Sequence, residues 1–204
     1  MLLRKHLGQG KLIDIDQVAL DRTVRLRFQT RNELGDTVEK QLVLEVMGRH
    51  SNLILLDEND RVLEAVHRVS HDMSRVRQIY PGKTYTVFPA NKLDVLTEEV
   101  SLTTLIEAAQ NEQSGGLTVK QLFYGQLTGF SPLVSVELCV RADVAPNTPI
   151  GALTSTERDA LDRQLSLLIS ALRADTYHPA LYCTPKNQAY PFALTHYGDP
   201  EVED

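Results

Sequence analysis

The chain has 204 residues, a formal net charge of −6 and 42% hydrophobic residues, enough to bury a sizeable core. Its longest purely apolar stretch, Leu53 to Leu56, is far shorter than the roughly 20 residues of a membrane-spanning helix. Cys139 and Cys183 are too far apart in sequence to form a zinc knuckle, and two cysteines make no disulfide framework. We therefore expect no membrane span, no metal and no cofactor.

Charge is distributed unevenly along the chain. Residues 1–92 carry 15 Lys and Arg against 12 Asp and Glu, whereas residues 93–204 carry 6 against 15. Such asymmetry indicates a nucleic-acid or other anionic partner for the basic half, or else two ordinary domains of unequal surface composition.

The first half predicts a series of antiparallel strands, at residues 11–19, 23–29, 41–46, 52–56 and 62–69. Over 23–29 apolar and basic side chains alternate strictly, which predicts a half-buried strand with a basic outer face. Gly48-Arg49-His50 predicts a short hairpin connection. A basic stretch at 75–80 then ends at the turn dipeptide Pro81-Gly82.

The second half is predicted to be mainly helical, with helices over residues 101–110 and 117–126. Ser131 as N-cap and Pro132 at the first helical position open a third helix. Thr154 and Glu157 form a capping box that opens a fourth. Two short closing strands are expected at 181–183 and 192–194, followed by a frayed acidic end at 199–204.

No motif for classical catalysis occurs in the sequence. There is no G-x-S-x-G, no phosphate-binding glycine loop and no Cys-His nucleophile signature. His67 and His71 fit a surface pair better than a metal site, because no carboxylate completes the ligand set. We therefore expect that the protein is not an enzyme.

Phosphate binding, in contrast, has two candidate sites. In the hairpin Gly129-Phe130-Ser131 a glycine turn precedes a helix whose exposed backbone N–H groups attract a phosphate oxygen. This hairpin resembles a helix-hairpin-helix element, and a plain capped helical hairpin is the alternative. The second candidate is a set of arginines able to offer planar donors to a phosphate backbone: Arg22, Arg25, Arg27, Arg49, Arg75 and Arg77.

Several segments, taken in order, resemble one known family. They are Met1 to Leu7, Asp21-Arg22, Glu45 to Leu55, Tyr80 to Tyr85 and Gly129 to Pro132. The pattern is similar to the N-terminal domain of the NFACT family, whose bacterial members carry the names RqcH and fibronectin-binding protein A. The resemblance spans almost the whole chain, and its most specific part is the Met-Gly-Arg-His-Ser-Asn block.

The resemblance implies an α+β fold similar to the N-terminal fold of DNA glycosylases. The expected parts are a β-rich portion at 1–92, a helix-hairpin-helix-like portion at 93–174, and closing strands with an acidic tail at 175–204. Family members normally have residues before this start, so we expect Met1 to be internal to the natural domain.

The resemblance also implies a function in the cytoplasm, on the ribosome. Family members bind the large ribosomal subunit obstructed by peptidyl-tRNA, recruit alanyl-tRNA and promote template-free C-terminal alanine tailing of the stalled chain. We disfavour two alternatives: a fibronectin-binding surface adhesin, because no export signal or anchor is evident, and a repair glycosylase, because its nucleophile and zinc finger are missing.

The family's residue roles transfer to two motifs. An Asp-Arg pair required for tRNA engagement corresponds to Asp21 and Arg22, and we expect Asp21 to orient the Arg22 guanidinium toward a phosphate or base edge. The Gly-Arg-His-Ser-Asn block adds three expected RNA-binding residues: His50, Ser51 and Asn52.

Overall fold

The computed structural model describes residues 2–72, 77–87, 92–111, 116–183, 188–198 and 202–203. The chain divides into two compact units, Met1–Ala90 and Asn91–Asp204. No helix in the described ranges is both long and apolar enough to cross a bilayer.

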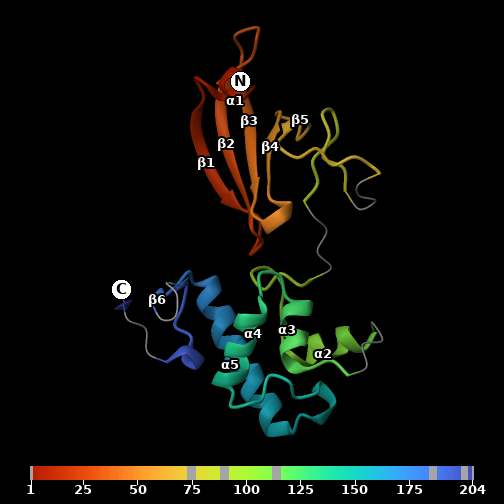
Figure 1. Ribbon diagram of the computed structural model, residues 1–204, viewed down its shortest axis with the longest axis vertical. Coiled ribbons are helices and arrows are strands. Elements are labelled where there is room, and N and C mark those ends of the chain that lie inside the picture. Colours follow the sequence, from red (N-terminus) through yellow and green to blue (C-terminus); the bar gives the residue numbers. More distant parts are fainter. Residues whose placement is uncertain are drawn as a thin grey trace. The chain divides into compact units, whose positions relative to one another are not determined.

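The first unit is an antiparallel β-meander preceded by one short helix (Figure 1). Each strand pairs with the next one along the chain, so that order in the sheet equals order in sequence. All five predicted strands are present, although the fifth is shorter than expected and the N-terminal helix was not predicted. The elements are α1 (Leu2–Leu7), β1 (Lys11–Gln17), β2 (Thr23–Arg31), β3 (Thr37–Glu45), β4 (Asn52–Leu56) and β5 (Val62–Ala65).

One face of this sheet carries the core of the unit. Val43 and Ile54 on the sheet pack with Ile79 and Tyr85 from the segment that follows β5. The register pairs Arg25 with Val43, so both side chains lie on this covered face. The predicted basic outer face is therefore wrong for Arg25, whose side chain is only 25% exposed.

The opposite face of the sheet is apolar and partly open. Val24, Leu26 and Phe28 of β2 lie on it at intermediate exposure. On the edge strand β1, Leu12 and Ile15 remain 43% and 58% exposed. The expected basic outer face is therefore lost at Arg25, whereas the Arg27 side chain remains 43% exposed.

The second unit is helical, and its helices begin where the capping signals predict. The α-helices of its described residues are α2 (Leu102–Asn111), α3 (Val119–Gln126), α4 (Pro132–Arg141) and α5 (Ser155–Arg173). The Glu157 carboxylate accepts from the Thr154 amide at 2.8 Å, and the Thr154 hydroxyl accepts from the Glu157 amide at 3.2 Å. The apolar stripe of α5 is buried: Leu161, Leu165, Leu168 and Ile169.

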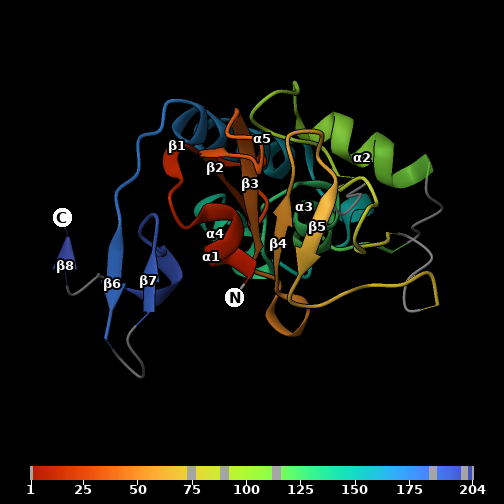
Figure 2. The same cartoon turned by 90° about the horizontal axis from the view of Figure 1, so that it is seen from above.

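The chain ends in a small sheet in the order β7-β6-β8 (Figure 2). Its strands are β6 (Ala180–Tyr182), β7 (Gln188–Tyr190) and β8 (Val202–Glu203). The strand predicted at 192–194 is wrong. The buried Tyr182 hydroxyl takes up both backbone groups of Leu194, accepting from its amide at 2.7 Å and donating to its carbonyl at 3.2 Å. Leu194 is thereby held by a side chain and not by a strand ladder.

The closing segment belongs to the helical unit. Glu137 of α4 accepts hydrogen bonds from the Thr195 amide and hydroxyl, each at 2.9 Å. Of the predicted frayed end, residues 199–201 and 204 lie outside the described residues, whereas Val202 and Glu203 form β8.

Candidate nucleic-acid interface

The turn between β1 and β2 presents Arg22 to solvent. The Asp21 amide donates to the Val18 carbonyl at 3.0 Å, and the Gln17 side-chain amide donates to the Asp21 carbonyl at 2.7 Å. Ala19 closes the turn in the left-handed region, at φ 51°. Because both ends of the turn are bonded, the backbone beneath the exposed Arg22 side chain is fixed. Sequence reasoning missed Gln17, since nothing in the sequence shows that its amide reaches the turn.

The turn that follows β3 lies beside Arg22. The Val46 amide donates to the Arg22 carbonyl at 2.8 Å, and the single 3₁₀ turn Gly48–His50 begins two residues later. Both turns lie at the same end of the sheet (Figure 1). The structure therefore brings together Arg22 and the Arg49-His50 pair, which are separated in sequence by the two strands β2 and β3.

Local hydrogen bonds shape the Gly48–His50 turn. Gly48 has φ 59°, a left-handed conformation that glycine adopts without steric cost. The Ser51 hydroxyl accepts from the Met47 amide at 3.0 Å, and Arg49 Nε donates to His50 Nε2 at 3.0 Å. Arg49 and His50 are both exposed, so they are available to a ligand. Ser51 instead contributes its hydroxyl to the turn.

Asp21 differs from the expected arrangement. Its carboxylate accepts a hydrogen bond from the Arg22 backbone amide at 2.7 Å. Within the described part of the chain the Arg22 guanidinium has no hydrogen-bond or ion-pair partner. Asp21 therefore fixes the backbone of the arginine, and the charged fork of Arg22 is free to meet a ligand.

Asn52 works inside the protein. It is 5% exposed, and its side-chain amide donates to the His67 carbonyl at 2.8 Å while its side-chain oxygen accepts from the His67 amide at 2.9 Å. These two bonds tie β4 to the chain leaving β5. The buried side chain of Asn52 therefore stabilises the backbone next to the site and is not exposed to a ligand.

Two of the other candidate arginines are held by acidic or aromatic partners. Arg27 pairs with Asp14 and, at 3.7 Å, with Asp16. The Arg25 guanidinium lies 4.0 Å from the Asp60 carboxylate and 5.7 Å from the centre of the Tyr85 ring. Because these charges are already partly compensated, Arg25 and Arg27 are weaker candidates for phosphate contacts than Arg22 and Arg49.

Arg77 is buried in a salt bridge with Glu45. Its two terminal nitrogens donate to the two carboxylate oxygens at 2.7 and 2.8 Å, and the side chains are 9% and 1% exposed. The Tyr85 hydroxyl donates to the same carboxylate at 2.7 Å. Burial and this bond to Glu45 raise the pKa of Tyr85 above its ordinary value. Arg77 thus fixes the segment that follows β5 on the sheet through this salt bridge. Arg75 lies outside the described residues.

The hairpin between α3 and α4 forms in the second unit as predicted. Gly129 has φ 80°, Phe130 is 7% exposed, and the Ser131 hydroxyl accepts from the Val134 amide at 3.3 Å. Pro132 has no N–H, so the first turn of α4 offers the Leu133 amide to an anion. This hairpin can therefore make fewer phosphate contacts than the sequence alone indicates.

Comparisons with known proteins agree on one family. A family model described as "NFACT N-terminal and middle domains" matches residues 1–203. The Rqc2 homolog RqcH of Bacillus subtilis is 35% identical over 147 residues, which cover 71% of this chain and 25% of that protein. The archaeal Rqc2 homolog aRqcH of Methanocaldococcus jannaschii is 31% identical over 144 residues. The chain thus spans about a quarter or less of the length of these relatives.

Solved structures share the fold. A fibrinogen-binding protein from Staphylococcus aureus superposes with a TM-score of 0.73 at 25% identity, covering 100% of this chain and 69% of the other. The N-terminal part of the fibronectin/fibrinogen-binding protein of Streptococcus suis gives a TM-score of 0.63 at 24% identity, covering 95% of this chain and 64% of the other.

Proposed function

Because the chain belongs to the NFACT family, we propose that it serves in ribosome-associated quality control as a tRNA-binding part that is not an enzyme. In this proposal it acts in the cytoplasm on a large ribosomal subunit obstructed by peptidyl-tRNA. It engages alanyl-tRNA there and supports template-free alanine tailing of the stalled chain.

One observation carries this proposal: two exposed cationic side chains, Arg22 and Arg49, lie at the same end of a rigid sheet. The turn below Arg22 is bonded at both ends, and the Arg49 turn is joined to it through Val46. An exposed guanidinium on a fixed backbone is pre-organised for bidentate contact with phosphate or a base edge. The basic excess of residues 1–92 favours the approach of an anionic partner.

Replacing Arg22 with alanine is expected to weaken tRNA binding by about 1–3 kcal/mol, because it removes a planar donor fork from the RNA. Loss of one phosphate contact also lowers the slope of log affinity against log salt by about 0.7–0.9. Fluorescence anisotropy with labelled tRNA at several salt concentrations measures both quantities. The melting temperature should stay nearly unchanged, since the side chain is exposed and unpaired within the described residues.

Arg31 supplies the matched control. It is exposed at the other end of the same strand β2, so Arg31→Ala removes an equal charge away from the proposed site. Equal weakening by both substitutions would mean that tRNA responds only to net charge, and the assignment of this end of the sheet would then fail.

Asp21 gives a separate prediction about positioning. Asp21→Asn keeps a side-chain oxygen that can accept from the Arg22 amide, whereas Asp21→Ala removes it. We therefore expect the alanine variant to lose tRNA affinity and the asparagine variant to retain most of it, in the same anisotropy assay. If asparagine is as damaging as alanine, the negative charge itself contacts the RNA.

A second candidate function is supported by the names of the structural neighbours, which refer to binding of fibrinogen or fibronectin. We disfavour it, because fibronectin-binding segments usually act as disordered strands added to a sheet edge, whereas this chain is folded. Surface plasmon resonance of the purified chain on immobilised fibronectin tests it, and we expect no binding at micromolar concentration.

A further inference from the structure

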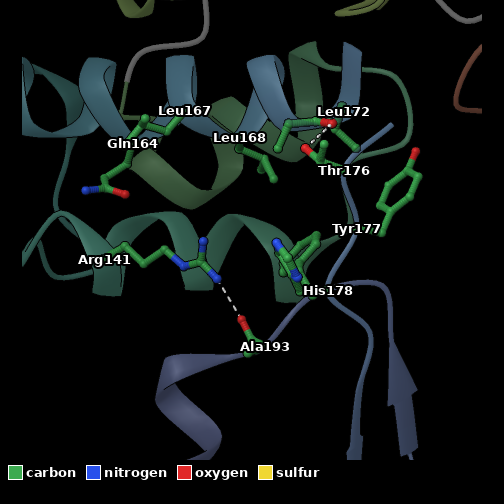
Figure 3. Close-up of a pocket in the computed structure, with 11 residues that line it drawn as sticks. Arg141, Gln164, Leu167, Leu168, Leu172, Thr176, Tyr177, His178 and Ala193 are labelled. Atoms are coloured by element: carbon green, nitrogen blue, oxygen red, sulfur yellow. Dashed lines mark hydrogen bonds between the residues drawn. The ribbon is translucent and has the colours of Figure 1, made fainter. Parts of the chain in front are cut away.

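A cavity of about 280 Å³ lies in the second unit, between α4, α5 and the segments 176–178 and 192–193. Figure 3 shows Leu168 of α5 directed into it from one side and the Arg141 side chain of α4 facing it from the other. The His178 ring closes one end, and the Gln164 amide lies at the other. Its size is near the low end for small-molecule sites, about 300 Å³.

Arg141 forms a rigid, flat wall of this cavity. Its Nε donates to the Glu137 carboxylate at 2.6 Å. A terminal nitrogen donates to the Ala193 carbonyl at 2.6 Å, as Figure 3 shows. The guanidinium carbon lies 5.6 Å from the centre of the Phe192 ring. Because Glu137 already balances its charge, Arg141 offers a stacking surface more than a phosphate ligand.

Two polar groups of the cavity have no partner. Neither the Gln164 amide nor the His178 ring makes a hydrogen bond within the part of the chain that the structure describes. Gln164 is only half-exposed, and its amide presents both a donor and an acceptor. An apolar side chain of a protein partner entering here would desolvate these groups without replacing their hydrogen bonds, which is unfavourable.

We propose that this cavity binds an unpaired nucleobase of RNA. A base has flat faces that stack on aromatic rings and guanidinium planes, and an edge that pairs with an amide such as that of Gln164. One flat face of the base meets the Arg141 guanidinium, which the Phe192 ring supports at 5.6 Å, and the aliphatic side of the cavity is formed by Leu168 and Leu172. The choice of RNA as the source rests on the proposed function, whereas the chemistry of the cavity does not.

Residues 93–204 carry an acidic excess, so we expect this cavity to hold the base and not the phosphate of a nucleotide. A base held by stacking and hydrogen bonds releases few counterions, so its affinity changes little with salt. The proposed Arg22 contact with phosphate is in contrast salt-dependent. The two sites can therefore be distinguished in one protein.

Isothermal titration calorimetry of the whole chain tests the proposal, with the four nucleoside monophosphates and their nucleosides as probes. At least one base is expected to bind, with similar affinity as nucleoside and as monophosphate. Gln164→Leu is expected to weaken this binding about tenfold, because the amide contact is lost. Ser166→Leu is the matched control, since Ser166 is exposed on the same helix and does not line the cavity.

Leu168→Trp fills the cavity and is therefore expected to abolish binding of the base, with circular dichroism to verify that the variant is folded. If this variant unfolds, the comparison of Gln164→Leu with Ser166→Leu decides alone. Absence of binding by every probe at millimolar concentration would overturn the proposal, as would equal weakening by Gln164→Leu and Ser166→Leu. A single-stranded oligonucleotide with the preferred base should bind at least as tightly as the free nucleotide, and failure to bind would overturn the assignment to RNA. Arg22→Ala leaves the nucleoside titration unchanged, so either proposal can fail without the other.

Discussion

Glu45→Ala is expected to lower the free energy of unfolding of the first unit by about 3–5 kcal/mol, because it leaves the buried Arg77 charge without its bidentate partner. The Glu45 side chain is 1% exposed and also accepts from the Tyr85 hydroxyl. The substitution therefore removes the acceptor of two side chains that hold the segment after β5 on the sheet. Urea unfolding followed by circular dichroism measures the effect.

Glu39 provides the control for this prediction. It is exposed on the same strand β3, so Glu39→Ala should change stability by less than about 0.5 kcal/mol. Combining Glu45→Leu with Arg77→Met removes both charges, and a buried ion pair replaced by apolar side chains often costs little. The double variant should therefore be more stable than Glu45→Ala. If it is not, the loss in Glu45→Ala comes from packing and not from the broken ion pair.

Glu137→Ala is expected to destabilise the second unit by about 3–5 kcal/mol, because its carboxylate is a buried, shared acceptor. The side chain is 2% exposed and binds Arg141, Thr195 and the His196 ring, the last with Nδ1 at 2.6 Å. Losing it releases the closing segment from α4. The chain has no tryptophan, so tyrosine fluorescence, to which the contacting Tyr182, Tyr190 and Tyr197 of the closing segment contribute, can follow urea unfolding of the variant and the wild type.

The same carboxylate predicts a loss of stability in acid. Burial alone would raise the pKa of Glu137, but hydrogen bonds from the Thr195 amide, Arg141 and His196 lower it from 4.5 to about 2. A lowered folded-state pKa means that the stabilisation is complete above the unfolded-state pKa and is lost as the pH falls from about 4.5 through about 2. Its size is roughly 3 kcal/mol by linkage.

Glu137→Gln removes this titration and serves as the comparison. Denaturant unfolding at several pH values should show a shallower acid dependence in the variant than in the wild type. Equal slopes would indicate that other carboxylates account for the acid sensitivity. Glu157→Gln, at the exposed capping box, should retain the larger part of the slope.

The local signals of the sequence predicted the helices well. Thr154 with Glu157, and Ser131 before Pro132, are short-range motifs whose partners lie within one helical turn, and both caps form. The β-meander was also predictable, because each strand is short and followed by a turn. The face of β2 was not, since alternation alone does not decide which side is covered when both sides can be packed.

The candidate site required long-range information. The acidic partner of Arg77 is Glu45, 32 residues away, and no spacing rule connects them. Asn52 lies in the most specific sequence block, yet its hydrogen bonds to His67 depend on a contact 15 residues away. Arg22 and Arg49 remained exposed because no acidic residue of the described chain pairs with them. The sequence could identify these residues as candidates. It could not distinguish the residues with internal structural partners, Arg77 and Asn52, from the exposed Arg22 and Arg49.

The order of strands in the first unit has a consequence for its folding during synthesis. Each strand of the meander pairs with its predecessor, so every pairing closes only a short loop and costs little chain entropy. The sheet can therefore grow from β1 to β5 as the polypeptide leaves the ribosomal tunnel, without waiting for distant sequence. Arg77 emerges after all five strands and is followed by Ile79 and Tyr85, so its ion pair with Glu45 and the packing of this segment close the core last.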